Sequence, residues 1–336
     1  MLAQKLPGRL DDAALLTTIA FADESEPWAT EATSKLASEL LTQQLDEDTV
    51  KRQFIAEAIL RDYLRPLFSK SRPATVTASG RKAEYIDPER QSGLPDDSRK
   101  TKPWKYEDLR AIPVLSWAVE AADVSYITYL PWPFILHDLT STSSISQEEL
   151  VSQHWPLFIP VLLTLADDST TQVRARGLEI LARFLAKFPG KKLQDTGLAT
   201  VFEQAVLPTL LYLPALTPVD ESLQLLEPAY AALLALADRL RADESGKQRT
   251  QLLGKLLREG VFTGYFHARE HVRIVNLLFR QAACIVTLMG INSVKHLKVR
   301  KNRRAKKKAQ ALHARPWYRS SLIIGLRILF PWSWLS

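Results

Sequence analysis

Amphipathic helical patterns recur in pairs along the second half of this 336-residue chain. Apolar residues at positions i, i+3, i+4 and i+7 predict each helix. The pairs cover 155–166 with 171–188, 196–213 with 219–240, and 247–261 with 269–289. Their first helices begin 41 and 51 residues apart, near the period of roughly 40–47 residues that HEAT and armadillo repeats have. Because patterns of period two are almost absent, we predict an all-α fold, a HEAT/armadillo-like helical-repeat solenoid.

Each predicted helix has one apolar face, which identifies the side that packs in the core. The predicted faces consist of Leu36, Leu40, Leu41 and Leu45; Phe54, Ile55, Ile59 and Leu64; Val173, Gly177, Ile180, Leu181, Phe184, Leu185 and Phe188; Leu223, Leu226, Tyr230, Leu233, Leu234, Ala237 and Leu240; and Val272, Val275, Phe279, Ala282, Ala283 and Val286. In the helix 171–188 the charged side chains of Arg176, Glu179, Arg183 and Lys187 lie outside the apolar face.

The chain divides into four segments by pattern. Residues 1–68 form an N-terminal helical segment, and 105–297 contain the HEAT-like α-solenoid. Between them, 69–104 lack apolar periodicity and are punctuated by proline and glycine, so we expect a disordered linker. Residues 298–336 form a basic and hydrophobic tail that we expect to lie outside the repeat fold.

The positive charge of the chain is concentrated at its C-terminal end. The net charge is +7, but no acidic residue follows Glu270, whereas 14 basic residues do. Residues 1–270 therefore carry a net charge of −7. The basic run at 300–308 allows three interpretations: an unselected solvated extension, a nuclear-import signal, or a segment that binds polyanions or an anionic membrane. We also hypothesise that residues 299–336 come from an alternative or misread end of the coding sequence.

Composition and missing motifs exclude several classes of protein. The single cysteine, Cys284, excludes a disulfide framework, and its place beside an apolar face predicts a buried structural thiol. Acidic residues within the first thirty positions argue against a secretory signal. No run of about 20 apolar residues predicts a membrane-spanning helix. Glycine-rich nucleotide-binding motifs are absent as well.

One short string resembles a catalytic motif. His267, Glu270 and His271 fit the H-x-x-E-H pattern of inverted zinc peptidases. Such enzymes take a third, carboxylate ligand from further along the chain, and no carboxylate side chain follows Glu270. We therefore predict surface histidines rather than a metal site. We nominate no catalytic, cofactor-binding or metal-binding residue, and we expect a protein that is not an enzyme and has no cofactor.

Three tryptophans have two possible roles. Trp117, Trp132 and Trp155 are expected to fill gaps between helices. Trp132 stands between two prolines, so the alternative for this residue is an exposed contact with a partner.

Residues 156–185 resemble a single HEAT repeat. Pro156 opens the first helix, Asp167-Asp168 forms the turn, and Arg174 enters the second helix. In HEAT repeats the turn carboxylate and this arginine commonly pair between neighbouring repeats, so the resemblance implies such a ladder here. The polar turn 167–169 is also expected to provide the N-cap of the second helix.

Three longer stretches resemble the family of Tel-two-interacting protein two. They are 155–189 (WPLFIPVLLTLADDSTTQVRARGLEILARFLAKFP), 196–214 (TGLATVFEQAVLPTLLYLP) and 290–298 (GINSVKHLK). The resemblance covers roughly 105–298 and stops after Lys298, where the helical array of the family typically continues. It implies membership of the TTT complex, with the Tel-two and Tel-two-interacting protein one subunits as partners.

The resemblance also implies a function. TTT is a co-chaperone complex that works with the heat-shock ninety machinery to stabilise and assemble phosphatidylinositol-kinase-related kinases, so we expect a non-enzymatic scaffold subunit in the cytoplasm and nucleus. The alternative is a helical-repeat transport adaptor that binds cargo or nucleic acid through the basic tail. Neither function implies a small-molecule substrate or a membrane span. Since the family array ends early here, we expect the apolar face of 269–289 to be partly exposed and the isolated chain to aggregate.

Overall fold

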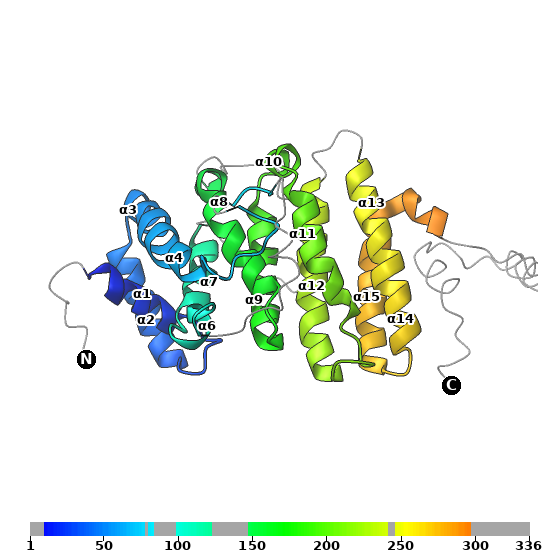
Figure 1. Cartoon of the computed structure of the whole chain (residues 1–336), viewed down its shortest axis with the longest axis horizontal. Coiled ribbons are helices and arrows are strands. Elements are labelled where there is room, and N and C mark those ends of the chain that lie inside the picture. Colours follow the sequence, from blue (N-terminus) through cyan, green and yellow to red (C-terminus); the bar gives the residue numbers. More distant parts are fainter. Residues whose placement is uncertain (1–9, 78–79, 84–98, 123–146, 241–245, 297–336) are drawn as a thin grey trace, which may run out of the picture. The chain divides into compact units, whose positions relative to one another are not determined.

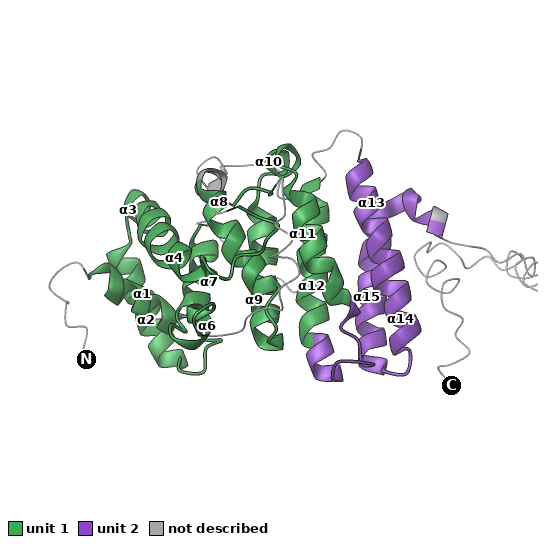
Figure 2. Ribbon diagram, viewed as in Figure 1, with its two compact units in different colours: residues 1–210, 224–242 green, residues 211–223, 243–336 purple. Residues whose placement is uncertain are grey.

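The computed structural model describes residues 10–77, 80–83, 99–122, 147–240 and 246–296 (Figure 1). The chain forms two compact units (Figure 2): unit 1 is residues 1–210 with 224–242, and unit 2 is 211–223 with 243–336. Every named element in the described ranges is helical, and the one β-pairing among them is an isolated bridge between Val76 and Lys82. The predicted all-α class is therefore confirmed.

The N-terminal helices of unit 1 start at polar caps. These elements are α1 (Asp12–Ala22), α2 (Glu31–Gln44), α3 (Asp48–Gln53), the π-helical η1 (Phe54–Leu64) and α4 (Arg65–Phe68). The Asp11 carboxylate accepts a hydrogen bond from the backbone N–H of Ala14 at 2.9 Å, and Thr30 and Thr33 form a capping box at the start of α2. The Ser34 hydroxyl of α2 donates to the carbonyl of Ala22 at 2.7 Å, which joins α2 to the end of α1.

The rest of unit 1 is built around a long helical hairpin. Its elements are α6 (Pro103–Tyr106), α7 (Ala111–Ala121), α8 (Gln147–Ala166), α9 (Thr171–Lys187), α10 (Gly190–Asp195), α11 (Leu198–Val206), the 3₁₀ turn η2 (Leu207–Leu211, whose last residue is in unit 2) and α12 (Val219–Arg239, whose first residues are in unit 2). Helices α8 and α9 pack closely at Gly177, where an added Cβ would lie 2.6 Å from the Cβ of Leu165. The glycine lets the two helices approach to this distance.

Unit 2 is a second helical hairpin. It contains α13 (Lys247–Lys255), the π-helical η4 (Leu256–Phe262), α14 (Thr263–Ala268), α15 (Val272–Met289) and the 3₁₀ segment η5 (Gly290–His296). The first three elements follow one another without a break and run antiparallel to α15 (Figure 1). The buried core of the unit includes Leu252, Leu253, Leu256, Leu257, Val261, Ile274, Leu277, Leu278, Ile285 and Met289.

The predicted apolar faces are correct for several helices and wrong for two. Phe54, Ile55, Ile59 and Leu64 are all buried, as are Ile180, Leu181, Phe184, Leu185 and Phe188. The α2 prediction fails at Leu36, which is 61% exposed, because α2 packs through the smaller Ser34 and Ala37 together with Leu41. The α15 prediction fails more widely: the buried face is Ile274, Leu277, Leu278, Ala282, Ile285 and Met289, so only Ala282 was identified. Apolar residues occupy most of the circumference of α15, and their spacing alone does not identify the face that is buried.

One described helix is apolar enough to bear on the expectation that the chain has no membrane-spanning helix. Among the residues that the structure describes, Val272–Val294 is long and apolar enough to cross a membrane by length and composition alone, with a mean hydropathy of 1.8 over 23 residues. One face of α15 nevertheless lies in the core of unit 2, and Arg273 in its first turn forms an ion pair with Asp220. A core helix of a folded domain has these properties too.

The predicted division into four segments stays a prediction. Residues 78–79 and 84–98 of the predicted linker, and 297–336 of the predicted tail, lie outside the described residues. The described ends of the linker segment are packed, however: Val76 and Trp104 are both buried. The described part of the N-terminal segment belongs to unit 1 together with α7, α8 and α9.

Candidate functional site

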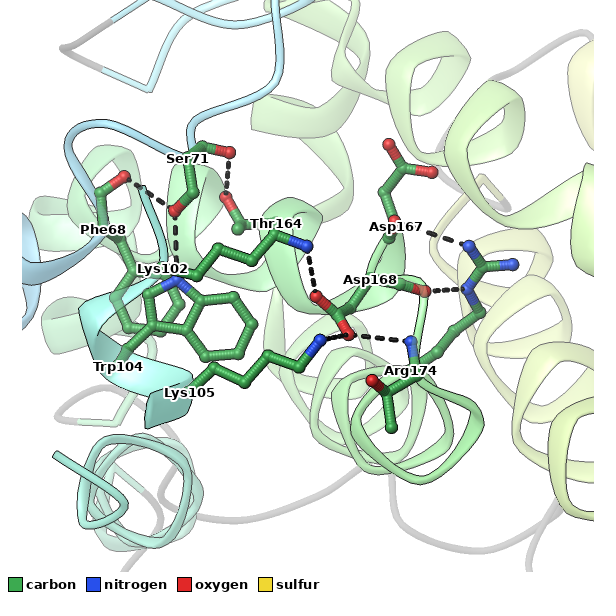
Figure 3. Close-up of polar contacts among 10 residues, drawn as sticks. Phe68, Ser71, Lys102, Trp104, Lys105, Thr164, Asp167, Asp168 and Arg174 are labelled. Atoms are coloured by element: carbon green, nitrogen blue, oxygen red, sulfur yellow. Dashed lines mark hydrogen bonds and ion pairs between the residues drawn. The ribbon is translucent and has the colours of Figure 1, made fainter. Parts of the chain in front are cut away.

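A buried polar cluster of unit 1 is centred on Asp168, in the turn between α8 and α9 (Figure 3). Its side chain is fully buried. The Lys102 ammonium donates to Oδ2 at 2.7 Å, and the Lys105 ammonium donates to Oδ1 at 3.2 Å. The backbone N–H of Thr170 donates to Oδ1 at 2.9 Å. Both carboxylate oxygens are therefore bonded, and both lysines come from a segment more than 60 residues earlier in the sequence.

The charges of this cluster favour the ionised carboxylate. Burial by itself would raise the pKa of Asp168, but the hydrogen bonds from Lys102 and Thr170 and the positive charge of Lys102 lower the pKa below its ordinary value. A buried carboxylate needs such partners, because an unpaired buried charge is strongly destabilising. Ion pairs of this cluster thus join the segment 102–105 to the α8–α9 turn.

Arg174 braces the same turn from the first part of α9. Its Nε donates to the carbonyl of Asp168 at 2.8 Å, and its Nη2 donates to the carbonyl of Asp167 at 3.4 Å. The resemblance to HEAT repeats implied a ladder between the turn carboxylate and this arginine of neighbouring repeats. Arg174 bonds backbone carbonyls of its own hairpin. Partial burial raises the pKa of the turn carboxylate Asp167, and the positive charge of Arg174 acts to lower it. Lysines from the segment before α7 bond the Asp168 carboxylate, and the ladder between neighbouring repeats stays a prediction. The N-cap is Thr170, whose backbone is extended, rather than a residue of 167–169. The Asp168 carboxylate accepts a hydrogen bond from the Thr170 N–H.

A second set of contacts fastens the same segment to α4 and α8. The Trp104 ring is fully buried and stacks on Phe68 with ring centroids 4.9 Å apart. Its indole N–H donates to the Ser71 hydroxyl at 3.0 Å (Figure 3). The Thr164 hydroxyl of α8 donates to the Pro160 carbonyl at 2.6 Å and makes a second, longer contact of 3.4 Å with the Ser71 carbonyl. Residues on both sides of 84–98 therefore pack on the hairpin of α8 and α9.

Helix α9 holds α1 and α7 through charged side chains. Arg176 forms an ion pair with Asp23 at the end of α1. The Arg183 guanidinium donates to the Ser116 hydroxyl of α7 at 3.2 Å, and the Lys187 ammonium donates to the Val119 carbonyl in the last turn of α7 at 2.6 Å. The positive charge of Lys187 at the C-terminal end of α7 is stabilised by the helix dipole, whose C-terminal end is negative. Sequence analysis placed these residues outside the apolar face, but amphipathic spacing does not show that they cross to neighbouring helices.

The residues considered for catalysis are not assembled into a reactive site. His267 and Glu270 are exposed, and His271 is half-buried at the start of α15. Among the described residues, no group of three or more histidine, cysteine and acidic side chains is placed to hold a metal ion. Cys284 is half-buried, and burial raises the pKa of its thiol; a raised pKa reduces the fraction of reactive thiolate.

The tryptophans considered for partner contacts are placed as follows. Trp155 is buried and meets Phe188 edge to face, with ring centroids 6.0 Å apart. Trp117 is partly exposed, and the Lys51 ammonium lies 5.9 Å from its ring centroid. Trp132 lies outside the described residues. Sequence analysis missed Trp104, which is buried against Phe68. A single tryptophan beside proline in an aperiodic stretch gives no indication that it is buried.

The described part of the chain thus has the properties of a helical protein whose polar clusters join helices to one another. Comparison with known proteins identifies it further: the chain belongs to the Tti2 family, whose family model matches residues 14–299. No curated protein and no solved structure gives a significant match to the sequence. Tti2 proteins are a family of non-catalytic complex subunits, and membership supports a role as a subunit of the TTT complex.

Proposed function

We propose that this chain is a non-enzymatic scaffold subunit of the TTT co-chaperone complex. In this role it binds the Tel-two and Tel-two-interacting protein one subunits, and it supports the stability and assembly of phosphatidylinositol-kinase-related kinases together with the heat-shock ninety machinery. It acts in the cytoplasm and the nucleus, without a cofactor or a small-molecule substrate.

The observation that carries the proposal is the family match over residues 14–299. The match extends from α1 to the end of η5, so it includes the N-terminal helices as well as the helical pairs. The fastened α8–α9 hairpin supports a rigid role, because buried ion pairs and stacked rings hold helices from distant parts of the sequence in one unit.

We further propose that the helical pairs stack as HEAT/armadillo-like repeats. The proposal is supported by two helical hairpins, α8 with α9 and α13–α14 with α15, because such repeats are built from pairs of consecutive helices. Stacked pairs bury a continuous core and leave an extended surface for other proteins. That surface is what a scaffold subunit needs.

An affinity purification of the tagged chain from cell extract tests the function. After washing at high salt, mass spectrometry is expected to recover the other two TTT subunits and client kinases, because an apolar interface depends weakly on salt. Recovery of import factors or nucleic-acid-binding proteins only at low salt would instead favour the transport adaptor, since phosphate and polyanion contacts weaken steeply as salt rises. A chain that recovers neither set would contradict both functions.

A further inference from the structure

The first two helices of unit 1 form a hairpin that is tied together at both ends. Helix α2 packs on α1, and on no other described helix to a comparable extent. The Ser34 hydroxyl at the start of α2 donates to the Ala22 carbonyl at the end of α1 at 2.7 Å. At the other end of the pair, the Leu10 backbone N–H donates to Oε1 of Gln44 at 3.0 Å. We call residues 10–45 the N-terminal hairpin.

Two arginines from outside the N-terminal hairpin bond its first helix. Arg176 of α9 forms an ion pair with Asp23, and both side chains are largely buried. Burial by itself would raise the pKa of Asp23, but hydrogen bonds from Ser25 and the positive charge of Arg176 lower the pKa below its ordinary value. The pair is therefore charged at neutral pH. The Arg110 guanidinium donates to the Thr17 hydroxyl of α1 at 2.9 Å.

Each of these arginines also has an acidic partner outside the hairpin. Arg176 donates to Glu179, one turn later on α9, at 3.2 Å. Arg110 donates to both carboxylate oxygens of Asp108, at 2.9 and 2.8 Å. Release of the hairpin would leave both guanidinium groups paired, so it avoids the large cost of a buried charge without a partner.

The connection from the N-terminal hairpin to α3 has the properties of a hinge. Asp46 and Glu47 are both exposed, and the side chain of Glu47, the N-cap of α3, makes no capping hydrogen bond. Helices α1 and α2 have 11 and 14 residues, and isolated helices shorter than about 12–15 residues are marginal in water. Detachment of the hairpin should therefore melt both helices together.

We propose that the N-terminal hairpin is a releasable segment that detaches from α7 and α9 and unfolds as one unit, with the Arg176–Asp23 ion pair as its latch. The rest of unit 1 stays folded during release, because the buried Asp168 cluster and the stacked Trp104 ring hold it. Local opening of this kind occurs at free energies below that of global unfolding. Release uncovers the apolar side of α1, including Leu15 and Ile19. The inference does not depend on the proposed function.

Hydrogen exchange of the full-length chain, followed by mass spectrometry, tests the proposal. Peptides of α1 and α2 are expected to exchange at a common rate, at least about tenfold faster than peptides of α8 and α9. Arg176→Gln is expected to speed exchange of α1 and α2 about tenfold and to change that of α8 less than about twofold, because it breaks a largely buried ion pair. The matched control is Arg183→Gln on the same helix: Arg183 bonds Ser116 of α7 instead of the hairpin. It should change exchange of α1 less than about twofold.

A double-variant cycle shows whether the ion pair is the latch. Asp23→Asn should speed exchange of α1 and α2 about as much as Arg176→Gln, and the two changes together no more than either alone, because both break the same pair. Effects that multiply in the double variant would overturn the latch. Wild-type α1 and α2 that exchange at different rates, or as slowly as α8, would overturn release as one unit. Exchange that rises equally in α8 and α9 would overturn the proposal too, since the whole unit would then be destabilised.

Discussion

Single residues carry much of the specificity of this fold, and Asp168 is the clearest case. Its buried carboxylate bonds two lysines that lie more than 60 residues earlier in the sequence, as well as the nearby backbone N–H of Thr170. Removing one partner of a buried ion pair costs more than the pair contributes net, because the remaining charge stays buried without compensation. The stability of unit 1 should therefore be unusually sensitive to this one side chain.

We predict that Asp168→Asn destabilises the chain by about 3 kcal/mol at neutral pH. The amide keeps the shape of the side chain but removes the negative charge that the buried Lys102 ammonium bonds. Urea unfolding followed by circular dichroism measures the difference. As a control, Asp62→Asn removes an exposed carboxylate that pairs only with its neighbour Arg61 among the contacts described, and it should change stability by less than about 0.5 kcal/mol. Similar losses in the two variants would refute the role of Asp168.

The same carboxylate predicts a pH dependence. The pKa of folded Asp168 is lower than its ordinary value near 3.8, so its stabilising effect is present above that value and is lost as the pH falls through the folded pKa. The difference in unfolding free energy between wild type and Asp168→Asn should therefore shrink when urea unfolding at pH 7 is compared with that below pH 4. A difference that stays constant over this range would show that ionisation of Asp168 is not the cause.

At the scale of elements, a glycine approaches helix α8, which contains Pro156 and Pro160. Pro160 lacks an N–H, so it cannot donate to the Pro156 carbonyl within the helix. Gly80, at φ +73°, approaches this carbonyl: an added Cβ would lie 1.8 Å from the Pro156 oxygen. Gly80 therefore packs on α8 at a place where only glycine fits.

We predict that Gly80→Ala destabilises unit 1 by about 3 kcal/mol, because it adds a clash to the strain of a positive φ. Gly197→Ala provides the matched control: Gly197 has φ +65°, but the nearest atom to an added Cβ is Lys82 Cδ at 3.9 Å. It should cost only the backbone strain of about 1 kcal/mol. Thermal unfolding of both variants measures the difference, and equal midpoints would mean that the Gly80 contact does not hold the segment.

The sequence predicts helices well and contacts between helices poorly. The α9 face from Ile180 to Phe188 was identified because a clear polar face opposes it. The buried face of α15 was not, since apolar residues surround much of that helix. The Asp168 cluster could not be predicted for another reason: nothing in the sequence around Lys102 indicates that it pairs with a carboxylate 66 residues away. The turn and the arginine were recognised, but the lysines that bond the turn carboxylate depend on tertiary packing.

At the scale of the whole molecule, the family match ends at residue 299, before most of the basic tail. The described helices lie within the matched region apart from the first residues of α1. We predict that deletion of residues 300–336 leaves binding to the other TTT subunits unchanged within about twofold, measured by titrating the immobilised pair of those subunits with each chain at high salt. A loss of more than tenfold would show that the tail, rather than the helical units, carries the interaction.

The central claim is that this chain is a stable structural subunit of TTT. The most direct measurement is size-exclusion chromatography with light scattering of the three co-expressed subunits at high salt. The account predicts one peak that contains all three chains and persists as salt rises, since an apolar interface is little screened. Elution of this chain apart from the other two subunits, at low as well as high salt, would contradict it.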